Sequence, residues 1–252
     1  MFDLAEIAAP PRLRPARPRP SLGLIGHGAF GAFIHPHLAR FFDVTVHDPA
    51  DTAAASLATT AAQQVVVLAV PLAQMRDVAA AVAPHLRPGA LVVDVCSLKV
   101  APLGILAELL PEHVEILGTH PLFGPQSGKA GIAGLRIALC PLRGRRARLA
   151  ARFLRRGFGL EVVQSTAEEH DRQMAYVQGL THIVSRIVLA MDVPALELRT
   201  TTFEHLTRMV DTVRHDSEAL FRTIAQDNPY AAEVRESFAQ ATATVLERLG
   251  TR

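Results

Sequence analysis

The chain of 252 residues is 49% hydrophobic, enough to bury a substantial core, and its two cysteines have no metal-ligand or redox spacing. It has no run of about 18 apolar residues and no basic-then-apolar leader, so a membrane span and secretion are not expected and a cytoplasmic protein is predicted. The formal charge of +2 arises in residues 1–20, and the neutral remainder argues against a nucleic-acid partner.

Residues 1–20 form a tail rich in arginine and proline. Five prolines lie between Pro10 and Pro20. Proline lacks the backbone N–H that a helix interior needs, so the tail cannot hold a helix and is predicted to be disordered.

Residues 21–165 alternate between apolar runs and helical segments. The expected strands are 21–25, 44–47, 65–70, 91–95 and 114–117, followed by 135–140 and 160–163. The expected helices are the segment up to about 41, then 50–61, 73–83, 101–110 and 145–156. Strands that are apolar throughout indicate a sheet covered on both faces. The sequence therefore predicts an α/β domain with a Rossmann-type, doubly wound parallel sheet.

After Ser165 no strand-like run occurs, and helical periodicity continues to the end of the chain. Thr166 and Glu169 fit a capping box at the start of a helix that extends to about residue 191. Further helices are expected at 199–227 and 230–249. Residues 166–252 are thus predicted to be an all-helical domain. It buries little apolar surface alone, so we expect it to pack on the sheet domain or to dimerise with a second copy.

A glycine-rich turn follows the first strand. Gly26, Gly28 and Gly31, with Phe30 in the same turn, open a helix, and Asp48 ends the next strand about 20 residues later. This arrangement is typical of dinucleotide binding, with the pyrophosphate at the helix N-terminus and the carboxylate on the ribose. Asp48 would repel a 2′-phosphate, so NAD is predicted as the cofactor in preference to NADP.

Two further loops follow strands at the same edge of the predicted sheet. Ser97 and Lys99 come after the fourth strand, and His120 comes after the fifth, just before Pro121. A histidine with restricted backbone freedom suits a general base. Taken singly, these residues also fit a helix-capping turn and a structural histidine.

Three segments together resemble the prephenate and arogenate dehydrogenase family. They are VDVCSLK at residues 93–99, THPLFGP at 119–125, and EHDRQMAYVQGLTH at 169–182. The resemblance covers roughly residues 22–230 in chain order, and it is far more specific than the glycine turn. It implies NAD-dependent oxidative decarboxylation of prephenate, or of arogenate as the alternative, in tyrosine biosynthesis. It also implies a helical second domain.

The resemblance assigns roles to individual residues. His120 matches the base that takes the proton of the ring hydroxyl, and Ser97 matches a serine that contacts both this histidine and the substrate. His182 matches a histidine of the substrate pocket. Arg208 matches an arginine that binds the ring carboxylate, with Arg222 as the alternative. Two more residues are assigned to substrate binding: Lys129 and Gln178. His170 and Asp171 are expected to stabilise the start of their helix.

The remaining alternatives concern the substrate and the protein class. Plant-type members that prefer arogenate have an acidic residue at the position matched by Cys140, so a neutral residue favours prephenate. A β-hydroxyacid dehydrogenase would need a catalytic lysine, yet no lysine follows Lys129. A catalytically inactive NAD-sensing protein would bind NAD without turnover. No metal is predicted, because His35 and His37 have no evident third ligand.

Overall fold

The computed structural model describes residues 19–250. The tail that was predicted to be disordered, residues 1–20, lies outside this range except for its last two residues. Within residues 19–250, no helix is long and apolar enough to cross a membrane.

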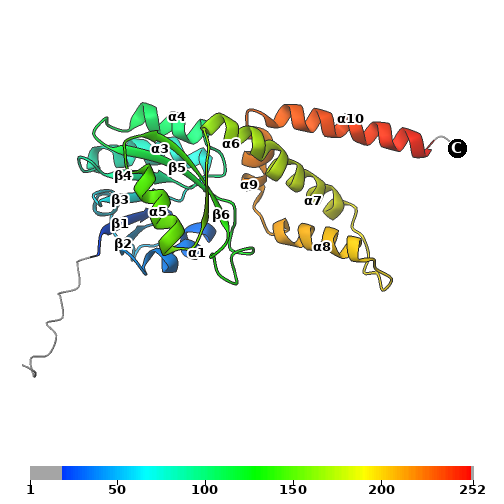
Figure 1. The fold of residues 1–252 in the computed structure, drawn as a ribbon, viewed down its shortest axis with the longest axis horizontal. Helices are drawn as coiled ribbons and strands as arrows, with labels where there is room; N and C mark the ends of the chain where they lie inside the picture. Colours follow the sequence, from blue (N-terminus) through cyan, green and yellow to red (C-terminus); the bar gives the residue numbers. More distant parts are fainter. Residues whose placement is uncertain (1–18, 251–252) are drawn as a thin grey trace, which may run out of the picture.

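A seven-stranded sheet forms the first part of the molecule (Figure 1), with the strand order β2-β1-β3-β4-β5-β6-β7. Its strands are β1 (Ser21–Ile25), β2 (Asp43–His47), β3 (Val65–Leu68), β4 (Leu91–Asp94), β5 (Glu115–Pro121), β6 (Arg136–Arg143) and β7 (Glu161–Gln164). Central strands such as β1, β3 and β4 are mostly apolar because both faces are covered, and Leu24, Val66 and Val92 are fully buried. The predicted Rossmann-type sheet is confirmed.

Two features of this domain differ from the prediction. β6 pairs antiparallel with β5, because a loop without a crossover helix connects Pro121 to Arg136. The helix expected at 50–61 forms only from Leu57 to Ala61. The Asp51 carboxylate accepts a bond from the backbone N–H of Ala53, and the Ser56 hydroxyl begins the helix by accepting from Thr59 N.

Helices cover both faces of the sheet and enclose two separate apolar cores. The first face carries α1 (Ala29–Leu38) and α5 (Ala147–Gly157). The opposite face carries α2 (Leu57–Ala61), α3 (Leu72–Val82) and α4 (Val100–Leu109), and a short 3₁₀ turn, η2 (Ala83–His85), follows α3. This arrangement leaves the carboxyl ends of β1, β3, β4 and β5 at one open edge of the sheet.

The second part of the chain is helical, as predicted. Its elements are α6 (Ala167–Met174), the π-helical segment η3 (Ala175–Leu180), α7 (Thr181–Ala190), α8 (Thr201–Val213), α9 (Glu218–Arg222), the π-helical segment η4 (Thr223–Asp227) and α10 (Ala231–Gly250). The Thr166 hydroxyl accepts a bond from Glu169 N at 3.1 Å, so the threonine half of the predicted capping box is present. The Glu169 carboxylate accepts a bond from Gln173 Nε2 at 2.6 Å and does not complete the box. The helix expected at 199–227 is interrupted before α9, where the Ser217 hydroxyl accepts from Leu220 N.

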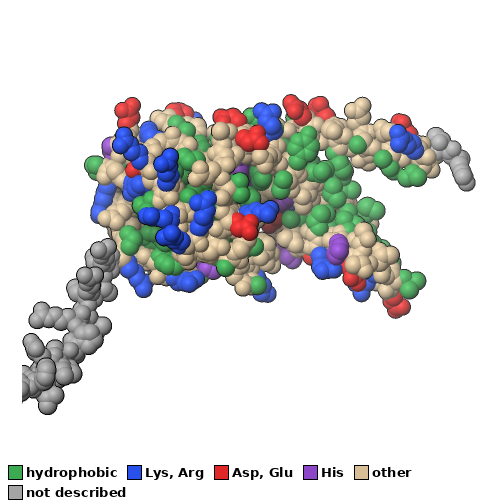
Figure 2. All heavy atoms as spheres, in the orientation of Figure 1, with side chains coloured by type: hydrophobic (Ala, Val, Ile, Leu, Met, Phe, Trp, Pro, Cys, Tyr) green, Lys and Arg blue, Asp and Glu red, His purple; other side chains and the backbone are tan. Residues whose placement is uncertain are grey.

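Helix α8 packs beside α7, whereas α7 and α10 extend away from the sheet domain and diverge from one another (Figure 1). Apolar side chains gather on the surfaces that face the gap between them (Figure 2). A groove of about 500 Å³ lies between α7 and α10 and is lined by Ile183, Ile187, Phe238 and Leu246, among others. Ile187 is 46% exposed and Leu246 is 60% exposed, so the helical domain leaves much apolar surface uncovered.

Two glycines of the first turn offer a matched test of local packing. A Cβ at Gly31 would overlap the carbonyl oxygen of Gly26, whereas a Cβ at Gly28 would meet no atom of the described chain within 4 Å. We expect Gly31→Ala to lower the free energy of unfolding by about 1–3 kcal/mol, because the backbone at Gly26 or Gly31 must move to make room for the new Cβ. Gly28→Ala should unfold at nearly the native denaturant midpoint. Chemical denaturation of both variants measures the difference, and equal midpoints would contradict the packing described.

Candidate active site

The glycine turn at the end of β1 forms an open cradle next to a fixed carboxylate. Gly26 has φ +93°, a conformation that favours glycine, and its N–H donates to His47 O. Gly28 is exposed at the start of α1, with free space where a side chain would lie. The positive end of the helix therefore stays accessible to an anion, and these residues fit the pyrophosphate of a dinucleotide.

Asp48 lies beside this cradle, at the end of β2. Its Oδ2 accepts a bond from His27 N at 2.6 Å, and its Oδ1 accepts from Ala50 N at 2.9 Å. These backbone hydrogen bonds, first from Ala50 and then from His27, lower the pKa of Asp48. The carboxylate is thus ionised and oriented, as required for accepting bonds from ribose hydroxyls. Phe30 is half-buried at the start of α1, with its ring against Phe33.

The glycine turn also contains a histidine pair that the sequence analysis missed. His27 Nε2 lies 3.2 Å from His35 Nδ1, because His35 faces the turn from within α1. Burial and the neighbouring His27 lower the pKa of His35. His35 was considered only with His37, and no sequence signal connects it with His27.

His120 lies inside strand β5 and not after its end. The strand continues through Pro121 because β6 pairs with it there, with His120 opposite Ala138. Side chains alternate along a strand, so His120 and Thr119 point to opposite faces of the sheet. The imidazole is 3% exposed and points to the face on which α6 packs.

Both ring nitrogens of His120 have a partner from the helical domain. Nδ1 lies 2.9 Å from His170 Nε2, and Nε2 lies 3.3 Å from the amide nitrogen of Gln178. His170 Nδ1 in turn lies 2.7 Å from Asp171 Oδ1. Two residues predicted separately, the base His120 and the substrate-binding Gln178, are thus brought together, and two residues expected only to stabilise a helix start join them.

The expectation for His170 and Asp171 therefore needs correction. Asp171 does bind the start of a helix, but that helix is α4: its carboxylate accepts bonds from the backbone N–H groups of Lys99 and Val100, both at 2.8 Å. The start of α6 is already capped by Thr166. His170 makes no contribution to either cap, and its contacts are with His120 and Asp171.

A buried ion pair lies beside His120. The Lys99 ammonium donates to Asp94 Oδ2, and neither side chain is exposed. Asp94 also accepts a bond from Cys96 N at 2.8 Å. Burial is the main cause that holds the pKa of His120 well below its usual range. Its imidazole is therefore neutral at physiological pH and able to accept a proton.

The other predicted substrate residues are placed differently. Ser97 is half-buried in the loop after β4, and its hydroxyl makes no hydrogen bond within residues 19–250, including to His120. Lys129 is exposed in the loop after β5. His182 is buried on α7, with Nε2 3.7 Å from Asp216 Oδ2, and burial lowers its pKa.

The two candidate carboxylate ligands lie outside this cluster. Arg208 donates to Glu204 O and lies 3.9 Å from the Glu204 carboxylate, with 69% of its side chain exposed. Helix α8, which carries it, lies away from the sheet (Figure 1). Arg222 ends α9 and is exposed. Neither arginine is brought to His120 within the described chain.

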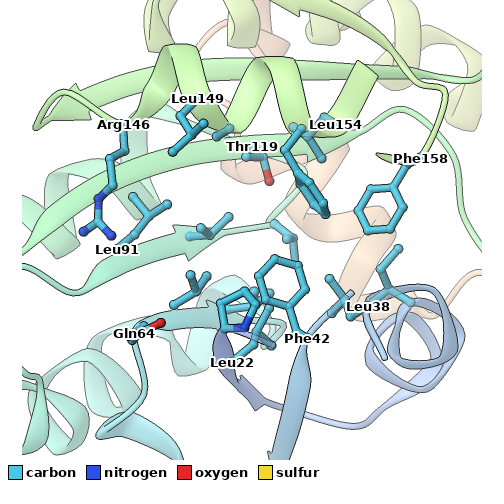
Figure 3. A pocket seen from close by; sticks show the side chains of 18 of the residues that line it. Leu22, Leu38, Phe42, Gln64, Leu91, Thr119, Arg146, Leu149, Leu154 and Phe158 are labelled. Carbon is cyan, nitrogen blue, oxygen red and sulfur yellow. The ribbon is translucent and has the colours of Figure 1, made fainter. Parts of the chain in front are cut away.

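A cavity of about 750 Å³ lies on the opposite face of the sheet, between α1 and α5 (Figure 3). Leu22, Phe42, Leu91 and Phe158 are among its mostly apolar lining residues. Thr119 also lines this cavity, so His120 points away from it. The cavity is therefore separate from the cluster of titratable groups.

Cys140 lies in β6, opposite Gly118, with its Sγ 3.5 Å from Thr166 O. Its side chain is 1% exposed, and burial raises the pKa of the thiol to about 11. The side chain at this position is thus uncharged at physiological pH.

Comparison with known proteins matches both parts of the chain to one family. Residues 41–143 match the description "Prephenate dehydrogenase, nucleotide-binding domain", and residues 166–250 match "Prephenate dehydrogenase, dimerization domain". Arogenate dehydrogenase 2 of Arabidopsis thaliana is 29% identical over 248 residues, which cover 90% of this chain and 69% of that protein. Arogenate dehydrogenase 1 of the same plant is 33% identical over 162 residues, 61% of this chain and 25% of that longer protein.

Solved structures show the same fold. Prephenate dehydrogenase from A. aeolicus, in complex with hydroxyphenyl propionate and NAD+, has a TM-score of 0.72 at 18% identity, covering 94% of this chain and 92% of that one. Arogenate dehydrogenase from Synechocystis has a TM-score of 0.63 at 18% identity, covering 91% and 93%. With a nucleotide-binding domain and a dimerization domain matched in order, the chain belongs to the prephenate and arogenate dehydrogenase family of oxidoreductases.

Proposed function

We propose that this chain catalyses the NAD-dependent oxidative decarboxylation of prephenate to 4-hydroxyphenylpyruvate. The observation that carries the proposal is His120, a neutral and buried imidazole at the carboxyl edge of the sheet. Its Nε2 faces Gln178 of the helical domain, so the base lies where the two domains meet. A substrate bound between the domains would present its ring hydroxyl to this nitrogen.

The chemistry needs one proton acceptor and one hydride acceptor. His120 Nε2 takes the hydroxyl proton while the ring carbon that bears this hydroxyl loses a hydride. NAD, held at the glycine turn beside Asp48, supplies the hydride acceptor when bound. The C–C bond to the ring carboxylate then breaks, carbon dioxide leaves with the carboxylate carbon, and its bonding electrons complete the aromatic ring.

Several residues are proposed to orient the substrate. Gln178 has a buried Oε1 that has no hydrogen-bond partner among residues 19–250, so it can accept a bond from a substrate hydroxyl. Ser97 and His182 are also proposed to contact the substrate. The Ser97 hydroxyl has no hydrogen bond within residues 19–250, and His182 is buried on the helix that follows Gln178. Lys129, which is exposed in the loop after β5, is proposed to bind a substrate carboxylate. Arg208, exposed beside Glu204, stays a predicted ligand of the ring carboxylate.

Arogenate is the second candidate substrate. The likeness to the Arabidopsis arogenate dehydrogenases favours it. The neutral Cys140 favours prephenate, because arogenate carries an ammonium group where prephenate carries a ketone, and the thiol offers no charge to it. NADH formation measured with prephenate and arogenate side by side discriminates between them. An at least equal kcat/KM with arogenate would reject the preference proposed.

Replacement of His120 tests the base. His120→Asn keeps a hydrogen-bonding group but cannot take a proton, so kcat should fall by about 10²–10⁴-fold while KM changes little. In the native enzyme, the acid limb of kcat/KM should lie below about pH 6.5, because the pKa of His120 is lowered. His205→Asn, an exposed histidine on α8, is the control and should retain native kinetics. A near-native kcat for His120→Asn would mean that another group is the base.

Asp48 determines the expected cofactor preference. Its ionised carboxylate would repel the 2′-phosphate of NADP, so kcat/KM should be at least about tenfold higher with NAD, a difference of about 1.4 kcal/mol. Asp48→Ser combined with Pro49→Arg should narrow or reverse this ratio, because the charge at the ribose changes sign. Equal efficiency of the native enzyme with both cofactors would refute the assignment.

We also propose a homodimer formed through the helical domain. The apolar groove between α7 and α10 and the match to a dimerization domain support it. Light scattering should give twice the chain mass at micromolar concentration. Leu246→Glu should shift the protein towards monomers, because it places a charge in the groove. The matched change Leu142→Glu, at an exposed leucine of the sheet domain, should not. A native monomer would contradict the proposal.

A further inference from the structure

A continuous hydrogen-bonded chain connects Asp171 to the face of His120 that meets the helical domain. Asp171 Oδ1 lies 2.7 Å from His170 Nδ1, His170 Nε2 lies 2.9 Å from His120 Nδ1, and His120 Nε2 lies 3.3 Å from the Gln178 amide. His170 is 3% exposed and Asp171 is fully buried. Buried polar groups in such a chain each need a donor and an acceptor role that agree with their neighbours.

Asp171 determines the direction of every bond in this chain. Its carboxylate already accepts bonds from the backbone N–H groups of Lys99 and Val100, so it acts as an acceptor. His170 must then carry its proton on Nδ1 and donate it to Asp171. In a neutral imidazole the other nitrogen is an acceptor, so His170 Nε2 accepts from His120 Nδ1–H.

The same logic leaves His120 Nε2 unprotonated, with its lone pair available as a hydrogen-bond acceptor. The amide nitrogen of Gln178, which can only donate, faces this atom, in agreement with the direction of the chain. The nitrogen that points to the helical domain is thus the basic one. A neutral His120 with the other tautomer would have no basic nitrogen at this position.

We propose that His170 and Asp171 are positioning residues for the reaction: they hold the ring of His120, fix its tautomer with Nε2 unprotonated, and stabilise its positive charge after it takes the substrate proton. The inference rests on the proposed function, since it needs His120 to be the base. A role in helix capping does not account for His170, because Thr166 caps α6 and Asp171 binds the start of α4.

The charges around His120 are consistent with this role. Lys99 is paired with Asp94, and the thiol of Cys140 is neutral, so Asp171 is the negative charge in this cluster that no ammonium neutralises. Protonation of His120 brings the cluster of Asp94, Lys99, Asp171 and the two imidazoles to zero net charge. A buried positive charge costs less free energy when its hydrogen-bond acceptor is polarised by a carboxylate.

An NMR measurement tests the tautomer without any need for turnover. In protein labelled with ¹⁵N-histidine, the two ring nitrogens of a neutral imidazole have distinct shifts, and His120→Asn identifies the signals of His120. We expect native His120 to be protonated at Nδ1. In His170→Leu the acceptor is lost, and the Nε2-protonated tautomer should gain population. A native His120 protonated at Nε2, or a tautomer unchanged in His170→Leu, would overturn the inference.

Kinetics of matched variants test the consequence for catalysis. His170→Leu should lower kcat by about 10–100-fold, as loss of an outer partner of a functional histidine does, with KM within about twofold of native. Its acid limb of kcat/KM should move to lower pH, because the imidazolium of His120 loses its acceptor. His170→Gln keeps an acceptor near the position of Nε2 and should recover part of the loss. Gln173→Leu, an exposed polar residue on the same helix, should behave as native.

The outcomes separate this inference from the proposed function. A native enzyme that turns over neither prephenate nor arogenate would reject the function, while the NMR shifts would still decide the tautomer. An active native enzyme whose kcat and acid limb are unchanged in His170→Leu would reject the inference alone. If His170→Leu does not fold, the tautomer of native His120 still tests the inference. The pH profile of His170→Gln also tests it, because this variant should move the acid limb of kcat/KM to lower pH, as expected for His170→Leu.

Discussion

The buried carboxylate of Asp171 is the interaction on which the rest of the structure depends. It accepts backbone bonds from Lys99 and Val100 at the start of α4 and a side-chain bond from His170. The carbonyl oxygen of the same residue accepts a bond from the Asn228 amide at 2.8 Å. One residue of α6 thus joins the sheet domain, the beginning of the helical domain and the segment before α10. Without these acceptors, several buried N–H groups would be unpaired, at a cost of about 1–3 kcal/mol each.

The position of Asp171 also explains why the proposed active site lies at a domain boundary. The open edge of a doubly wound sheet exposes the ends of its central strands, and β4 and β5 contribute Lys99 and His120 from there. The sheet domain alone would leave His120 open to water. Packing of α6 and the π-helical segment η3 against this edge buries the imidazole and brings Gln178 to its second nitrogen. The neutral state of the His120 imidazole results from this burial.

The two faces of the sheet separate structural from chemical roles. On one face, α1 and α5 enclose an apolar cavity, and aromatic rings that line it, such as Phe42 and Phe153, contact one another. On the other face, apolar packing by α3 and α4 surrounds the polar cluster near β4 and β5. Because side chains alternate along β5, neighbouring residues serve the two faces: Thr119 lines the cavity and His120 joins the cluster.

The sequence by itself determined the features that depend on neighbours along the chain. The apolar runs indicated the sheet, the glycines and Asp48 indicated the cradle, and Thr166 indicated the helix start, because each depends on local backbone geometry or local hydrogen bonds. Only the tertiary structure decided that His170 contacts His120, 50 positions earlier, and that Asp171 binds a different helix from its own. Those contacts depend on how α6 crosses the edge of the sheet, and no local pattern specifies the angle and position of that crossing.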